Sequence, residues 1–320
     1  MATTTLPAAQ QPGLPSGPTG AAPPGGTGRR VLRELRRDIG AVLSTAFLAL
    51  IVVMALCAPL ISTLTGHGPD TFDSAAVDKD LGGLPKGSLG GISGDHWLGV
   101  EPQNGRDILV RIAYGARISL LIAVSATVLT TVIGVVLGLL AGFYGRWVDQ
   151  VISRLMDFLM AFPALIFMIA VLSALPAGNR PVLLVIVLSG FGWPYLARVV
   201  RGQTLTLTGR EFVEAARASG AGSRALIFAE ILPNLRSTII VMTTLAVPGY
   251  IGTEAGLSFL GVGVTPPTAS WGQMIANSVS WYQVDPMYFV IPGAFLFGTV
   301  LSLTVVGDRL RHALDAGEAS

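Results

Sequence analysis

Six long apolar stretches constrain this sequence more than any other feature. They lie at about residues 41–64, 118–143, 151–175, 181–200, 237–259 and 288–306. A helix needs about 20 mainly apolar residues to cross the hydrocarbon core of a bilayer, which is about 30 Å thick. Each stretch is close to that length. We therefore predict an all-α, polytopic integral membrane protein with six transmembrane helices.

The scarcity of charged side chains supports this prediction. Only 12% of the 320 residues are charged and 51% are hydrophobic, whereas a soluble domain carries about 25% charged residues. Too few polar side chains remain to cover a soluble globule. This composition excludes a soluble enzyme, a disordered chain and a nucleic-acid-binding protein. The net charge of +2 gives no reason to expect nucleic acid as a partner.

Residue types that usually build a chemical site are sparse. A single cysteine excludes an intrachain disulfide framework. The three histidines, His67, His96 and His312, lie outside the apolar stretches and at no ligand spacing, so we expect no metal centre and no cofactor. The sequence has no GxxxxGK[ST] loop, which indicates that this chain does not hydrolyse nucleotide by the P-loop route.

Helix-breaking residues interrupt three of the apolar stretches. Pro163 removes a backbone donor from the third stretch and predicts a kink there. The fourth stretch contains Gly190, Gly192 and Pro194, and we expect it to bend there; the fifth contains the further breakers Pro248, Gly249 and Gly252. Such residues are tolerated in a bilayer only where neighbouring protein or a water-filled cavity satisfies the freed backbone groups. The sequence therefore predicts a packed bundle around a pathway.

Positive charges indicate the orientation in the membrane. With six spans and the N-terminus inside, 15 of the 21 Lys and Arg residues fall on the inner side. Such an excess marks cytoplasmic segments, so we place both termini in the cytoplasm. The expected segments are an N-terminal tail at 1–38 that is disordered over 1–28, a first transmembrane helix at 39–64, an extracytoplasmic segment at 65–117, a transmembrane domain at 118–307 and a C-terminal tail at 308–320.

The inner loop between the fourth and fifth stretches, residues 201–236, has a helical pattern of its own. It predicts a short helix from Glu211 to Ser219, which Gly220-Ala221-Gly222 would end. Ser223 is a capping residue type and predicts a second short helix from Arg224 to Leu232, followed by Pro233. Two short helices joined by a glycine turn would form a rigid projection for contact with a soluble partner.

The spacing within this loop resembles the EAA signature of ABC importer permeases. The sequence has Glu214-Ala215-Ala216, then three residues before Gly220, then nine residues before Glu230-Ile231-Leu232-Pro233. It departs from the family pattern at Glu230, where an apolar residue or histidine is usual. The resemblance implies a coupling helix that docks in a groove of a cytoplasmic ATPase. The residues it assigns to this coupling are Glu214, Ala215, Ala216, Gly220, Leu232 and Pro233.

Two further segments are similar to the C-type permeases of the dipeptide, oligopeptide and nickel branch of that family. One is His96-Trp97-Leu98-Gly99 followed by Gly105-Arg106-Asp107, although Val100 to Asn104 carries one extra residue. The other is Glu254 to Gly261 with Ser270-Trp271-Gly272. The resemblance extends from about residue 30 to 316. It implies the type-1 permease fold, a second homologous permease, two ATPase subunits and an extracytoplasmic substrate-binding protein.

Several charged residues lie near the expected membrane boundaries. Glu254 follows the glycine-rich part of the fifth stretch, and it either borders the outer gate or pathway or has a packing role. We expect Arg106 and Asp107 to fix an outer helix or to contact the second permease. Arg154 and Asp157 are three residues apart and are expected to pair on one helix face.

These features together predict the permease subunit of an ATP-driven importer of peptides or similar solutes in the cytoplasmic membrane. Alternating access would be driven by partner ATPases, so the chain is not an enzyme and needs no catalytic residues. An intramembrane enzyme would need reactive groups at membrane depth, and no histidine lies there. The alternative is a secondary transporter that works alone. It should show an internal repeat and intramembrane carboxylates for ion coupling, and we find no clear repeat.

Overall fold

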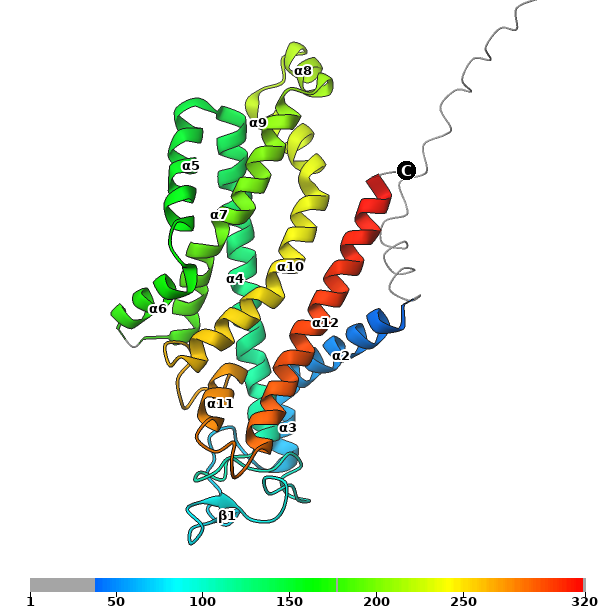
Figure 1. The fold of residues 1–320 in the computed structure, drawn as a ribbon. Helices are drawn as coiled ribbons and strands as arrows, with labels where there is room; N and C mark the ends of the chain where they lie inside the picture. Colours follow the sequence, from blue (N-terminus) through cyan, green and yellow to red (C-terminus); the bar gives the residue numbers. More distant parts are fainter. Residues whose placement is uncertain (1–37, 177, 319–320) are drawn as a thin grey trace, which may run out of the picture.

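The structure is a computed structural model that describes residues 38–318 except residue 177. Long helices lie side by side and α8 (Glu211–Ala218) projects at one end, while a short β hairpin lies at the other (Figure 1). The hairpin pairs β1 (Val77–Asp78) antiparallel with β2 (Leu84–Pro85), with Val77 opposite Pro85. The disorder predicted for residues 1–28 lies outside the described part of the chain.

The predicted all-α fold class is confirmed. The remaining elements are α2 (Ile39–Leu56), α3 (Ala58–Thr65), α4 (Ile108–Tyr144), α5 (Arg146–Met160), α6 (Ala164–Ala174), α7 (Arg180–Thr208), α9 (Ser223–Ala225), the π-helix η1 (Leu226–Ile231), α10 (Leu232–Phe259), α11 (Trp271–Ser278) and α12 (Met287–Glu318). The predicted C-terminal tail at 308–320 is therefore helical as far as residue 318, because α12 continues through it.

Five of these helices are long and apolar enough to cross a membrane, and α5 with α6 forms a sixth span if the bent pair is counted as one. The two halves of that pair meet at an angle of 87°. The bend is the kink that Pro163 predicted: Pro163 lies immediately before α6, in an extended conformation that a helix cannot contain. Helix α7 continues through Pro194 and α10 continues through Pro248, so neither proline ends a helix.

Two predicted boundaries differ from the structure. The first span was expected to be one helix over 39–64, but α2 ends at Leu56 and α3 begins at Ala58, with a proline in the first turn of α3. A proline there cannot donate to the preceding turn, so the ladder breaks. The second apolar stretch predicted a helix from about residue 118, but α4 begins at Ile108 because the Asp107 side chain accepts from the Val110 amide at 2.9 Å.

The contact between α4 and α7 is unusually close. Gly134, Gly138 and Gly142 recur every four residues along α4. A Cβ atom placed on Gly138 would lie 2.7 Å from the Ala197 carbonyl oxygen, and one on Gly142 would lie 2.6 Å from Thr204 Cβ. Small residues at this spacing let two helix backbones approach, which is a common basis of packing between membrane helices. This contact positions the end of α7 from which the projecting loop departs.

Candidate coupling site and buried polar contacts

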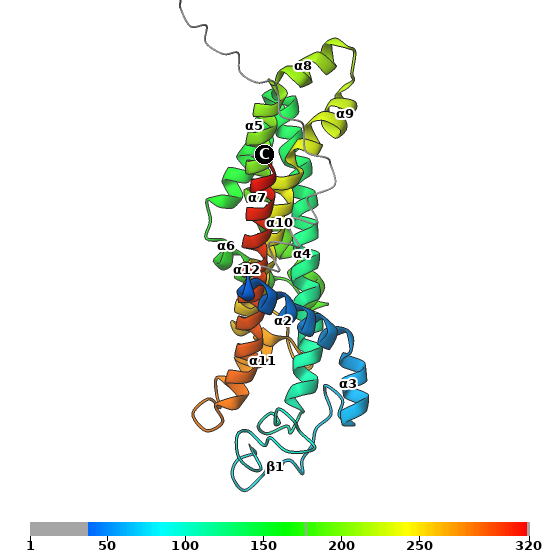
Figure 2. The same cartoon turned by 90° about the vertical axis from the view of Figure 1, so that its right-hand side faces the viewer.

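We call residues 210–231 the elbow: α8, the turn after it, α9 and the π-helix η1. Figure 2 shows α8 beyond the ends of the long helices, and α9 on the chain that returns beside them into α10. The helix predicted over Glu211 to Ser219 is present as α8, which ends at Ala218. Two acidic residues in its first turn, Glu211 and Glu214, and Arg217 in its last turn favour this helix through its dipole.

Gly220 makes the turn of the elbow, as the spacing predicted. Its φ angle is +88°, in the left-handed region that side chains with a Cβ adopt at a cost. The Gly220 amide donates to the Arg217 carbonyl at 3.0 Å, and the Ala221 amide donates to the Ala216 carbonyl at 3.0 Å. These two bonds form a Schellman motif, which satisfies the last carbonyl groups of α8. The turn after α8 therefore has a single, hydrogen-bonded backbone geometry.

The second half of the elbow differs from the prediction. Gly222 precedes α9, Ser223 makes no side-chain cap, and Pro233 does not end a helix. The chain instead widens into η1, where the Leu232 amide donates to the Ile227 carbonyl five residues back. Pro233 then lies in the first turn of α10, and the two residues before it, Ile231 and Leu232, keep right-handed helical backbone angles. The helical path from α9 into α10 is consequently unbroken.

The six predicted coupling residues divide into two groups. Glu214, Ala215 and Gly220 are exposed on the elbow, and Pro233 is exposed in the first turn of α10. Ala216 and Leu232 are partly buried and pack against the apolar cluster that holds the elbow to the bundle. The apolar residue that anchors α8 is Val213, which is fully buried, whereas its neighbour Phe212 is 40% exposed.

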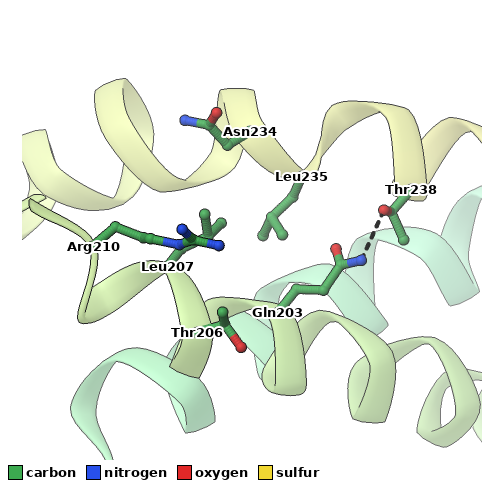
Figure 3. A pocket seen from close by; sticks show the side chains of 7 residues that line it. All are labelled: Gln203, Thr206, Leu207, Arg210, Asn234, Leu235 and Thr238. Atoms are coloured by element: carbon green, nitrogen blue, oxygen red, sulfur yellow. Dashed lines mark hydrogen bonds between the residues drawn. The ribbon is translucent and has the colours of Figure 1, made fainter. Parts of the chain in front are cut away.

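A cleft of about 370 Å³ lies at the base of the elbow, between the end of α7 and the start of α10 (Figure 3). We call it the root cleft. Its lining residues are Gln203, Thr206, Leu207, Arg210, Asn234, Leu235 and Thr238. The Gln203 side-chain amide donates to the Thr238 hydroxyl at 3.0 Å, which links α7 to α10 across the cleft. These residues come from two segments that are separated in the sequence, so no local pattern marks them as one site.

A second cleft separates the glycine-rich part of α10 from α6. It has a volume of about 470 Å³, and Pro248, Gly249, Gly252 and Gly256 line it opposite Met168. The helix-breaking residues of the fifth stretch, Pro248, Gly249 and Gly252, therefore border an open space in the structure. Their lack of bulk leaves room between α6 and α10.

Glu254 is fully buried, with 0% of its surface exposed. Its carboxylate accepts from the Ser119 hydroxyl of α4 at 2.9 Å and from the Ser258 hydroxyl at 2.8 Å. The Ser258 hydroxyl in turn accepts from the Val264 amide at 3.0 Å. Glu254 thus fastens α10 to α4 and to the loop after α10. Of the two roles considered for Glu254, these contacts favour packing.

A buried ionic cluster ties the outer segment to the bundle. Glu101 contacts Arg106 at 2.6 Å and the Arg111 Nε atom at 2.7 Å, and all three side chains are at most 6% exposed. Arg111 also donates to the Pro69 carbonyl at 2.9 Å and to the Gln273 side chain of α11 at 3.2 Å. The expectation that Arg106 and Asp107 fix an outer helix agrees with this cluster and with the cap on α4.

Two histidines that are far apart in the sequence meet beside this cluster. The His96 Nδ1 atom lies 2.8 Å from Asp107, its Nε2 atom lies 3.3 Å from Asp73, and the His67 ring stacks on His96 at 4.4 Å. One ligand-type atom from each of His67, His96 and Asp107 falls within 4.8 Å of the others. Sequence spacing did not reveal this meeting. The Ala75 amide and His96 together hold the pKa of Asp73 below its usual value.

Two ion pairs join α5 to α7. Asp157 pairs with Arg198 at 2.6 Å, which is not the partner expected from the helix period, since Arg154 was predicted. Asp149 accepts two hydrogen bonds from the Arg201 guanidinium, one of them 2.7 Å long. These ion pairs therefore hold α5 against α7, although the chain bends away from α7 between α5 and α6.

Known proteins are similar to this chain in sequence and in fold. The family model for the inner membrane component of binding-protein-dependent transport systems matches residues 134–318, and that for the N-terminal membrane domain of oligopeptide transport permease C matches 26–80. The oligopeptide transport permease OppC of Escherichia coli K12 is 38% identical, with 90% of this chain and 92% of that protein covered. OppC of Bacillus subtilis is also 38% identical, with 86% and 85% covered.

One solved structure resembles the fold. It is a chain from inward-facing conformations of the MetNI methionine ABC transporter, with a TM-score of 0.51 and 19% identity over 64% of this chain and 96% of that one. This likeness concerns the fold alone. The first family model spans more than half of the chain, and the OppC relatives span nearly all of it. The chain therefore belongs to the multi-pass inner-membrane permease components of binding-protein-dependent ABC importers.

Proposed function

We propose that this chain is the C-type permease of a peptide importer, and that it pairs with a second homologous permease above two ATPase subunits. The peptide substrate is inferred from relatives that are named oligopeptide permeases. The extracytoplasmic binding protein would deliver the peptide to the hairpin end of the bundle. Both termini and the elbow would lie in the cytoplasm, which agrees with 15 of the 21 Lys and Arg residues on that side.

The elbow is the observation that carries this proposal. An exposed Glu214 and Ala215 stand on a short helix whose far side is anchored by the buried Val213. This arrangement is suited to a helix seated in a groove of another protein, because small exposed residues permit close approach. We assign Glu214, Ala215 and Gly220 to ATPase contact and turn geometry, and Ala216, Leu232 and Pro233 to the connection with the bundle.

The unbroken path from the elbow into α10 suggests how ATP hydrolysis moves the bundle. A displaced elbow would carry the start of α10 with it, because η1 runs directly into α10 without a break in the helical backbone. Helix α10 borders the cleft opposite α6 and is tied to α4 through Glu254. The ATPases can shift the inward–outward equilibrium only if they bind the two elbow positions with different affinity. Hydrolysis itself occurs on the partner subunits.

Charge reversal at Glu214 tests the proposal. We expect Glu214→Lys to abolish peptide-dependent ATP hydrolysis in proteoliposomes that contain the complete importer, because the exposed carboxylate would be replaced by a cation at the ATPase contact. Loss of ATPase subunits from the purified complex measures the same effect directly. Asp80→Lys, an equal change at an exposed site at the opposite end of the molecule, is the matched control and should leave assembly intact.

Two results would contradict the proposal. One is normal assembly and peptide uptake by the Glu214→Lys complex. The other is peptide uptake by the purified chain alone, driven by an ion gradient, since a stand-alone secondary transporter predicts that result.

A further inference from the structure

The root cleft offers hydrogen-bond donors and no acidic side chain. Among its seven lining residues, Arg210 contributes a guanidinium, Gln203 and Asn234 contribute side-chain amides, and Thr206 and Thr238 contribute hydroxyls. Figure 3 shows Arg210 extending between the two helices toward the cleft. Within the described part of the chain, its guanidinium takes part in no ion pair or hydrogen bond. The cleft therefore presents a free positive charge.

Several of these donors retain hydrogens for a ligand. The Gln203 amide uses one hydrogen on Thr238, and the Asn234 amide uses one on the Glu230 carbonyl at 2.6 Å. Each side-chain amide carries two hydrogens, so one remains on each. A guanidinium with two nearby amides matches the several oxygens of a phosphate group, which arginine binds through paired hydrogen bonds.

The position of the cleft indicates what carries the phosphate. The apolar stretch of α7 ends at about residue 200 and that of α10 begins at about residue 237, so the lining residues fall at the polar edge of both spans. That edge lies at the depth of the lipid headgroups. Leu207 and Leu235 complete the lining with apolar surface. Basic pockets between membrane helices on the cytoplasmic side are known to bind anionic headgroups.

We propose that the root cleft binds the headgroup phosphate of an anionic phospholipid of the inner leaflet, and that this lipid supports coupling. The proposal rests on the cytoplasmic placement of the elbow given above. Arg210 is the residue immediately before α8, and Asn234 lies in the first turn of α10. A phosphate held by both would brace the elbow against α10, so the occupied cleft transmits elbow movement better than the empty one.

The test uses the complete importer in nanodiscs of phosphatidylcholine, with and without phosphatidylglycerol. We expect phosphatidylglycerol to raise peptide-dependent ATP hydrolysis, and Arg210→Gln to reduce its apparent affinity about tenfold, the order expected for losing hydrogen bonds to a charged group. Arg236→Gln is the matched control, because Arg236 is an exposed arginine on α10 that does not line the cleft. It should keep the response, and native mass spectrometry should show bound phosphatidylglycerol lost only from the Arg210→Gln complex.

Several results would overturn the inference. They are equal effects of the two variants, no response to phosphatidylglycerol in the wild type, or full replacement of the lipid by inorganic phosphate. Weaker ATPase binding by Arg210→Gln in lipid-free detergent would indicate a carboxylate of the ATPase as the true ligand. Arg210→Lys, which keeps the charge, provides a second variant if the first fails to assemble and should show an intermediate affinity. Peptide uptake by the wild type in phosphatidylcholine alone tests the proposed function separately.

Discussion

Single buried polar residues connect segments of this protein that are distant in the sequence. Glu101 and Arg111 neutralise each other inside the outer segment, and Glu254 receives two hydroxyl hydrogen bonds between α4 and α10. Removing one partner of such a contact leaves an uncompensated buried charge, which costs more than the contact gains. Asp285 is a different case. It is 4% exposed next to the start of α12, and burial raises the pKa of its carboxyl.

The raised pKa of Asp285 predicts a pH-dependent stability. A carboxyl whose pKa is higher in the folded than in the unfolded state destabilises the fold when ionised, and this cost disappears as the pH falls through both values. The amides of Met287 and Tyr288 offset part of the cost. We expect Asp285→Asn to raise the free energy of unfolding by about 1 kcal/mol at pH 8, since the amide has nearly the same size but carries no charge to bury.

Thermal unfolding of the detergent-solubilised chain at pH 8 and pH 4 measures this difference. The gain in Tm should shrink at the lower pH, where the wild-type carboxyl is protonated. Asp80→Asn, at an exposed position, should change neither Tm. A gain for Asp285→Asn that is equal at the two pH values would contradict the account, because the charge would then not be its cause.

The residues at the two ends of a helix determine its bounds in this protein as much as its apolar residues do. Asp107 begins α4 ten residues before the apolar window, and Pro163 divides one span at an angle of 87°. The elbow depends in the same way on the residues that end α8. Its two Schellman hydrogen bonds require a left-handed residue at Gly220.

Gly220→Ala is predicted to weaken this turn. A Cβ at a φ of +88° costs about 1 kcal/mol, although no neighbouring atom lies in its way. We expect a fall in peptide-dependent ATP hydrolysis of several-fold, with the bundle still folded, because the orientation of α8 changes relative to η1. Gly222→Ala is the matched control, since the φ of Gly222 is −72° and suits any residue. Equal activity of both variants would show that the turn geometry does not matter.

At the scale of the whole molecule, one continuous helical path leads from the elbow to the cleft that faces α6. The elbow passes through η1 into α10, α10 borders the cleft facing α6, and Glu254 ties its far end to α4. The close glycine contact between α4 and α7 would provide a fixed side if α10 moves as proposed. Under the proposed function, coupling would depend on the stiffness of the short joint η1.

A flexible joint should separate ATP hydrolysis from transport. Phe228 and Ala229 are exposed on η1, so replacing both with glycine removes little packing but adds about 1 kcal/mol of helix penalty at each. We expect the double glycine variant to bind the ATPases normally while importing several-fold less peptide per ATP hydrolysed. Phe228→Ala, which keeps the native Ala229, is the control and should keep the ratio near that of the wild type. An unchanged ratio with glycine would mean that the movement reaches the bundle by another route.

The sequence alone determined the all-α membrane fold, the six apolar stretches, the kink at Pro163 and the turn at Gly220. These features depend on local chemistry: the length of an apolar run, a missing amide hydrogen and a left-handed backbone. Only the tertiary structure decided that Asp157 pairs with Arg198, that His67 stacks on His96, and that Glu254 lies inside a packed contact. Each of these joins segments distant in the chain, and helix packing brings them together at distances that no spacing along the sequence encodes.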